Sequence, residues 1–219
     1  MPSLDRFLDA PAGATPDERH NFRVAYIESA LIGIISAAST FLPVFLARLG
    51  ATNLQVSLLV ALPSLTGVIL AIPFGGLIQT RRNIIPWYSR GRLGGQLGYV
   101  AIAAASFVLP QDLVVPGILA LWAVVTVFST VTSISFAVVM DATAGSRGRY
   151  ELMSRRWSIL GLMSGVSLAV VGQVLGALEF PAGYQFVFAG LGLLGLVAFR
   201  YGSAIRVPDH PPTVAGGGG

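Results

Sequence analysis

The sequence contains no cysteine, no lysine and only two histidines. Without cysteine the chain can form no disulfide, no thiolate metal site and no cysteine nucleophile. His20 and His210 both lie in polar stretches near the ends of the chain, which argues against a buried haem or metal ion held by histidine. We therefore expect neither a cofactor nor a bound metal.

Charge is also scarce, because charged residues make up only 11% of the chain. Soluble domains carry about a quarter, so too few polar side chains are present here to cover a globule in water. With a mean hydropathy of +0.74, the composition predicts an all-α integral membrane protein. We expect a cytoplasmic tail at 1–22, a transmembrane bundle at 23–202 and a disordered Pro- and Gly-rich tail at 203–219.

Six apolar segments predict six membrane-spanning helices, since about 20 apolar residues cross a bilayer. They are Val24–Leu46, Leu54–Ile78, Leu93–Leu109, Leu113–Met140, Trp157–Leu178 and Tyr184–Tyr201. If these spans alternate in direction, thirteen of the fourteen arginines lie on one side of the membrane and only Arg48 lies on the other. Because arginine is enriched in cytoplasmic loops, we expect both termini in the cytoplasm of a multi-pass protein of a bacterial inner membrane.

Glu28 is the one charged residue well inside a predicted span. It lies about one helical turn, or ~6 Å, into the first span. An acid in a span indicates a functional site, which would bind a proton, a coupling cation or a basic group of a substrate. The alternative is an ion pair with an arginine at the same depth, for which the candidates are Arg23, Arg92, Arg155 and Arg156.

The fourth predicted span is rich in hydroxyl groups. They belong to Thr126, Ser129, Thr130, Thr132, Ser133 and Ser135. Hydroxyl groups can bond to the backbone of their own helix, so this span can either pack in the centre of the bundle or line a wet cavity. The first span has polar positions along one strip as well, including Ser36 and Thr40.

Two stretches resemble sequence motifs of the major facilitator superfamily of transporters. The family's loop motif after the second span, usually written G-x-L-a-D-r-x-G-r-k, is similar to PFGGLIQTRR in this chain. Gly75 and Leu77 match its first positions, and Arg81 and Arg82 supply its basic character. Gln79 stands where the motif has an aspartate that helps to latch two halves of the transporter together, and the second glycine is out of register.

The second likeness follows the fourth span, in a segment that we expect to be a loop. There the family has an acid followed by R-G-R, which matches Asp141 with Arg147, Gly148 and Arg149. From the residues alone, we expect Asp141 to pair with Arg147 or Arg149.

The resemblance covers about Asn21–Arg206 and is to the N-terminal six-helix half of such a transporter. It implies a protein of twelve spans in two halves, each half a three-plus-three inverted repeat, with spans one and four lining a central cavity. The candidate cavity or coupling residues are then Glu28, Ser36, Thr40, Ser129, Thr132 and Ser133.

On this interpretation the chain is half of a secondary transporter that moves a small solute, with a second copy or a separate chain as its other half. Two alternatives stay open: the sequence is a piece of a longer protein, or it is a non-transporting structural or assembly subunit of a larger membrane complex. We expect no enzyme, because no predicted span contains a histidine or lysine to act as a base. The arginines favour anionic lipids as partners, and not nucleic acid. The substrate is not indicated.

Overall fold

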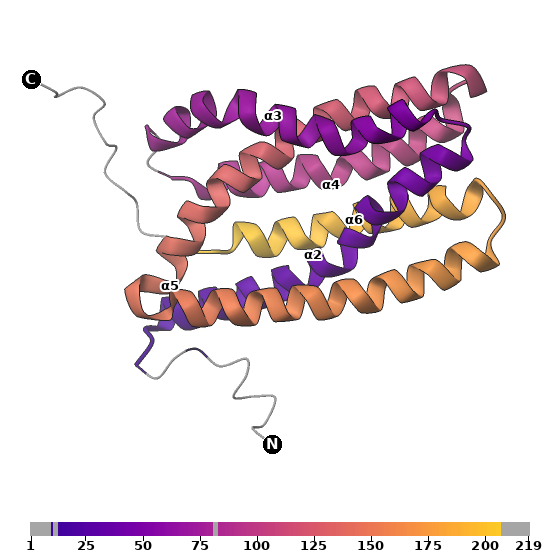
Figure 1. The fold of residues 1–219 in the computed structure, drawn as a ribbon. Helices are drawn as coiled ribbons and strands as arrows, with labels where there is room; N and C mark the ends of the chain where they lie inside the picture. The colour runs from indigo at the N-terminus through magenta and orange to yellow at the C-terminus, as the bar shows by residue number, and fades with distance from the viewer. Residues whose placement is uncertain (1–9, 11–12, 81–82, 207–219) are drawn as a thin grey trace, which may run out of the picture.

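The computed structural model describes residue 10 and residues 13–80 and 83–206, without the side chains of 79, 141–142 and 144–147. Within these residues the chain forms an antiparallel helical bundle without strands (Figure 1). The helices are α2 (Pro16–Arg48), α3 (Asn53–Gln79), α4 (Ile85–Val108), α5 (Gln111–Ala177) and α6 (Ala182–Ser203). The predicted all-helical class is therefore confirmed for the described part of the chain.

Five segments of the described chain are long and apolar enough to cross a membrane. They are Pro16–Arg48, Asn53–Ile78, Gln111–Met140, Gly148–Ala177 and Ala182–Ser203. The predicted span Leu93–Leu109 is not among them, although it is helical within α4 and packs against α5 and α6. Arg90, Arg92 and Gln96 make this helix more polar than the other segments.

Helix α5 is 67 residues long and contains both the fourth and the fifth predicted spans. The structure therefore differs from the expected loop between these spans, because the chain stays helical while it reverses direction near the label α5 in Figure 1. No proline interrupts residues 141–156, and Glu151 forms an ion pair with Arg155 one turn further on, which favours a helix. We call Gln111–Met140 the first arm of α5 and Gly148–Ala177 the second arm.

Local sequence signals fix both ends of α2. The Thr15 hydroxyl accepts a hydrogen bond from the backbone of Glu18, whose carboxylate in turn accepts from the backbone of Thr15. This capping box begins the helix within the segment expected to be a tail. At the other end Gly50 has a φ of +89° and donates to the carbonyl oxygen of Ala47, which ends α2 and turns the chain into α3.

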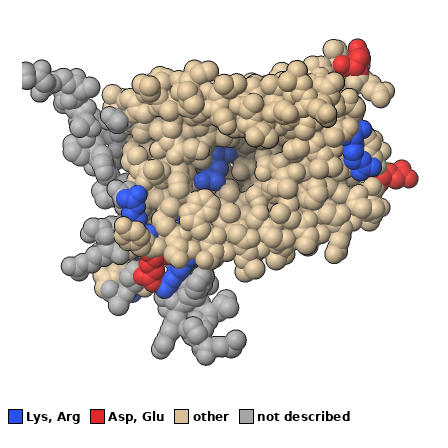
Figure 2. Space-filling view, viewed as in Figure 1, with Lys and Arg blue, Asp and Glu red and all other residues tan. Residues whose placement is uncertain are grey.

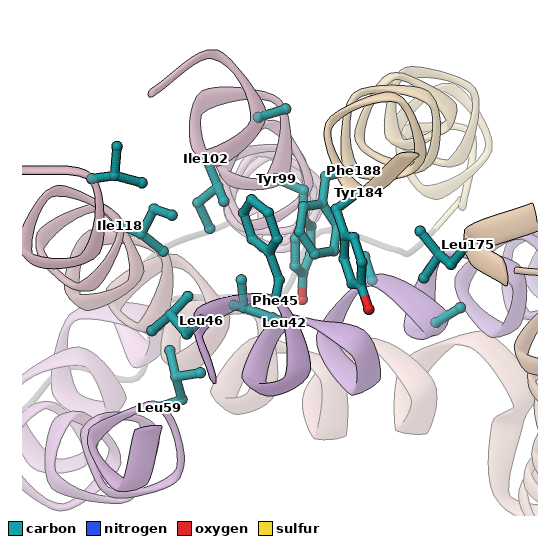
Figure 3. Packing of buried hydrophobic residues seen from close by; sticks show 14 of the residues in the cluster. Leu42, Phe45, Leu46, Leu59, Tyr99, Ile102, Ile118, Leu175, Tyr184 and Phe188 are labelled. Carbon is teal, nitrogen blue, oxygen red and sulfur yellow. The ribbon is translucent and has the colours of Figure 1, made fainter. Parts of the chain in front are cut away.

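An aromatic cluster fills the bundle near the end at which α5 begins. Phe45, Tyr99, Tyr184 and Phe188 come from α2, α4 and α6 and point toward one another (Figure 3). The ring of Phe45 stacks on that of Tyr184 with 5.1 Å between their centroids. Burial of these large rings binds three helices together at this end.

Helix α2 begins and α6 ends at the same end of the bundle, which we call the terminal end. Asn21 donates to the backbone oxygen of Arg206 at 2.7 Å and accepts from its backbone nitrogen at 2.8 Å. A second buried cluster, which includes Tyr26 and Tyr88, lies near this end. Arg48 ends α2 at the opposite end of the bundle.

Candidate functional site

A pocket of about 350 Å³ lies between α4 and the two arms of α5. Figure 2 shows charged side chains gathered at the two ends of the bundle and, between them, one group of arginine atoms inside a hollow. Helix α4 lines the pocket with Arg92, Gln96 and Tyr99, and the second arm of α5 lines it with Arg156 and Trp157. The pocket thus brings two guanidinium groups into the interior of the bundle.

The first arm of α5 supplies hydroxyl groups to the same pocket. Ser129, Thr132 and Ser133 line it, and the side chains of Ser129 and Ser133 are exposed. The Thr132 hydroxyl approaches α4 closely because the facing residue is Gly91, where a Cβ atom would lie 2.9 Å from Thr132 Oγ1. Three of the six candidate residues from the sequence therefore meet at one place.

The other hydroxyl groups of the predicted fourth span are buried and do not line the pocket. Thr126 Oγ1 lies 2.7 Å from Thr66 Oγ1 of α3, and the buried Thr130 and Ser135 donate to carbonyl oxygens one turn earlier in α5. One face of this span therefore carries buried hydroxyl groups, and the other lines the pocket.

Ser36 and Thr40 do not line the pocket. Ser36 Oγ lies 2.7 Å from Ser164 Oγ of the second arm of α5, and the exposed Thr40 donates to the carbonyl oxygen of Ser36 at 3.4 Å. The polar strip of α2 is therefore turned toward the second arm, and α2 lines the pocket with Ile32 alone. Ser36 and Thr40, expected on the wall of a cavity between two halves, thus lie apart from the pocket within this chain.

Glu28 is fully buried and does not line the pocket, but it pairs with Arg92, which does. Its Oε1 lies 3.1 Å from Arg92 Nε, without the geometry of a hydrogen bond. The Tyr88 hydroxyl lies 2.8 and 3.0 Å from the two carboxylate oxygens and donates to them. Arg92 Nη2 donates to the same hydroxyl at 2.7 Å. Of the four arginines expected near Glu28, Arg92 is thus its ion-pair partner.

Arg156 is only 2% exposed and its side chain lines the pocket. Its guanidinium lies over the ring of Phe136, 4.5 Å from the centroid. Its Nε has no hydrogen-bond partner among the described residues. Among the described side chains, Glu28 is the acid that interacts electrostatically with both Arg92 and Arg156.

Gln96 is a pocket residue that the sequence reasoning missed. Its Oε1 atom is buried and has no hydrogen-bond partner among the described residues. The sequence feature that could have indicated Gln96 is its polar amide, which lies inside a mostly apolar predicted span. The sequence indicates Arg92 and Arg156 only as candidate partners of Glu28, because it does not show which other helices they face.

The residues that carry the family resemblance lie away from the pocket or beyond the described structure. Gly75 and Leu77 lie in the last turns of α3, and Arg149 is exposed on α5. Outside the described residues lie the side chains of Gln79, Asp141 and Arg147, together with Arg81 and Arg82.

Within the described ranges, no three histidine, aspartate or glutamate side chains gather as they would around a metal ion. No family model, curated protein or solved structure matches the chain. The fold and composition by themselves define the class, an all-helical integral membrane protein that crosses the membrane several times.

Proposed function

We propose that the chain is one half of a secondary transporter of the major facilitator type, which moves a small solute across a membrane together with a second six-helix half. The pocket between α4 and α5 is the observation that carries this proposal. Polar groups inside a membrane are costly and mark paths for substrates or ions. A volume of about 350 Å³ falls within the range of small-molecule pockets, roughly 300–1,000 Å³.

The hollow is open on one face of the bundle (Figure 2). This chain therefore supplies one wall of a cavity, and a second copy or a separate chain of similar fold would supply the other. That requirement links the pocket to the two-half architecture of the family that the sequence resembles.

The proposed topology has six crossings with both termini in the cytoplasm of a bacterial cell. Helix α4 provides the sixth crossing, because its 24 residues extend about 36 Å and the hydrocarbon core is about 30 Å thick. The arginines support this orientation, since Arg48 ends α2 at the end opposite the terminal end, whereas Arg200 lies in the last turn of α6, at the terminal end. Arg19 and Arg23 lie in the first turns of α2, Arg90 and Arg92 in the first turns of α4, Arg149, Arg155 and Arg156 near the start of the second arm of α5, and Arg206 just after α6. Such an excess favours a cytoplasmic location and contact with anionic lipids.

Single-cysteine labelling tests whether the pocket holds water in the membrane. The chain has no cysteine, so a Ser133→Cys variant reports on this one position. We expect it to react with a membrane-impermeant maleimide. The matched control is Leu162→Cys on the second arm of α5, whose side chain is 68% exposed and would face lipid, so that it should not react. Equal labelling at both positions, or none at Ser133→Cys, contradicts a water-filled cavity.

The native mass of the particle, extracted gently from its own membrane, tests the need for a second half. A particle of two six-helix chains supports the transporter.

For such a particle, we further expect uptake of its solute to change in a Glu28→Gln variant, because Glu28 holds Arg92 at the pocket. Unchanged uptake would remove Glu28 from the mechanism.

The alternative function is a structural or assembly subunit of a larger membrane complex. The observation that favours it is the number of polar groups that are satisfied inside the bundle, such as the pairs Ser36–Ser164 and Thr66–Thr126. This function predicts a particle with many different subunits and an unlabelled Ser133→Cys variant.

A further inference from the structure

The charges around the pocket do not balance among the described side chains. Arg92 and Arg156 both line it, and Glu28 is the acid that interacts electrostatically with the two of them. Glu28 forms its ion pair with Arg92, and Tyr88 bonds to both members of that pair. One carboxylate therefore faces two guanidinium groups, and one positive charge is left without a counterion among the described side chains. Because Glu28 pairs with Arg92, the excess charge lies on Arg156.

The surroundings of Arg156 are those of an anion-binding site. The side chain is 2% exposed, so the protein has removed a cation almost completely from solvent. Its Nε lacks a hydrogen-bond partner among the described residues. The rest of the guanidinium lies over the rings of Phe136 and Trp157 and next to the hydroxyl of Tyr88, which carries no charge to balance it. A buried cation without an ion pair of its own among the described side chains is costly, and a bound anion would lower that cost.

We propose that the pocket binds a small organic monocarboxylate. Its carboxylate pairs with the Arg156 guanidinium, because the planar fork of N–H donors matches two carboxylate oxygens. Its apolar part lies against Phe136 and Leu160, which line the same pocket. The exposed hydroxyl groups of Ser129 and Ser133 face the ligand as further donors.

The proposed ligand is also the substrate class of the proposed transporter. Only its transport, and not its binding, rests on the proposed function. Binding itself requires no transport, so the two can fail separately. Binding of a carboxylate without its uptake into vesicles would support the site and contradict the transporter. Uptake of uncharged solutes with no binding of carboxylates would overturn the site and leave the transporter standing.

The test is equilibrium binding of radiolabelled benzoate and hexanoate to the full chain in phosphatidylcholine nanodiscs. Benzamide and hexanamide serve as uncharged analogues of the same shape. We expect the carboxylates to bind and the amides to bind at least about tenfold more weakly. Equal binding of acid and amide, or no binding of either carboxylate, overturns the proposal.

Variants locate the binding at Arg156. Arg156→Gln should weaken benzoate binding by at least about tenfold, whereas Arg155→Gln, which removes the neighbouring cation that pairs with Glu151, should leave it unchanged. Glu28→Gln should tighten binding, because it leaves the positive charge of Arg92 uncompensated. If Arg156→Gln does not fold, Arg156→Lys keeps the charge without the planar fork and should still weaken binding. Unchanged binding in the folded Arg156 variant contradicts the site.

Lipid is the other source of an anion that could reach Arg156. Nanodiscs that contain phosphatidylglycerol distinguish it from a soluble carboxylate. If phosphatidylglycerol binds in an Arg156-dependent manner and neither carboxylate binds in its absence, the pocket holds a lipid headgroup and the proposal is wrong.

Discussion

The buried cluster of Glu28, Tyr88 and Arg92 makes a measurable prediction for Tyr88→Phe. Tyr88 is 0% exposed, and its hydroxyl both donates to Glu28 and accepts from Arg92. Phenylalanine keeps the ring and opens no cavity, so the variant loses only the hydroxyl. Hydrogen bonds inside membrane proteins average about 0.6 kcal/mol, whereas bonds to charged groups reach about 1.5–3 kcal/mol. We therefore expect the free energy of unfolding to fall by about 1–3 kcal/mol for the two bonds together.

Reversible unfolding in mixed micelles, with helical circular dichroism as the signal, measures this loss. Tyr26→Phe is the matched control, because Tyr26 belongs to the same buried cluster and is 3% exposed. Its buried hydroxyl makes no well-formed hydrogen bond among the described residues, although it lies near the guanidinium of Arg155. Its removal should cost clearly less than removal of the Tyr88 hydroxyl, because only a weak interaction with Arg155 is lost. Equal losses in the two variants, or a loss below about 0.5 kcal/mol in Tyr88→Phe, would refute the role given to the Tyr88 hydroxyl.

Two further variants test packing in the same unfolding assay. Gly33→Ala should destabilise by about 1–3 kcal/mol, because a Cβ atom there would lie 2.6 Å from the backbone oxygen of Leu160. Gly161→Ala, which has nothing within 4 Å of the added atom, should be neutral or slightly stabilising, and an equal cost in both would contradict the close approach of α2 to α5. Arg48→Gln should cost about 0.5–1 kcal/mol, because the guanidinium lies 4.6 Å from the centroid of the Phe180 ring. No loss of stability would mean that this cation–π contact is not formed in the bilayer.

Hydropathy located the helices better than it located their ends. The segment Leu93–Leu109 was recognised, but α4 begins eight residues earlier, at Ile85. The segment between the fourth and fifth predicted spans stays helical, because residues 141–156 contain no proline and Glu151 pairs with Arg155 one turn away. Hydropathy measures how apolar a segment is, whereas helix ends depend on caps, proline and local pairs.

The candidate site was predicted in part. Hydroxyl groups repeated along one span pointed to Ser129, Thr132 and Ser133, which line the pocket. The same reasoning applied to the first span pointed to Ser36 and Thr40, which lie elsewhere. The two spans look alike as sequences because each has a polar strip, and only the neighbour that each strip faces distinguishes them.

The sequence by itself determined the class of this protein: an all-helical chain whose composition excludes a water-covered globule and cysteine chemistry. It also predicts an asymmetry of the arginines across the membrane, because that prediction needs only the order of spans and loops. The tertiary structure alone decided that Glu28, Tyr88 and Arg92 form one buried cluster and that Arg156 and Gln96 share a pocket. The physical reason is that a helix face against lipid and a face against another helix are equally apolar. Hydropathy therefore cannot give the rotation of each helix against its neighbours, and that rotation is what brings distant residues together.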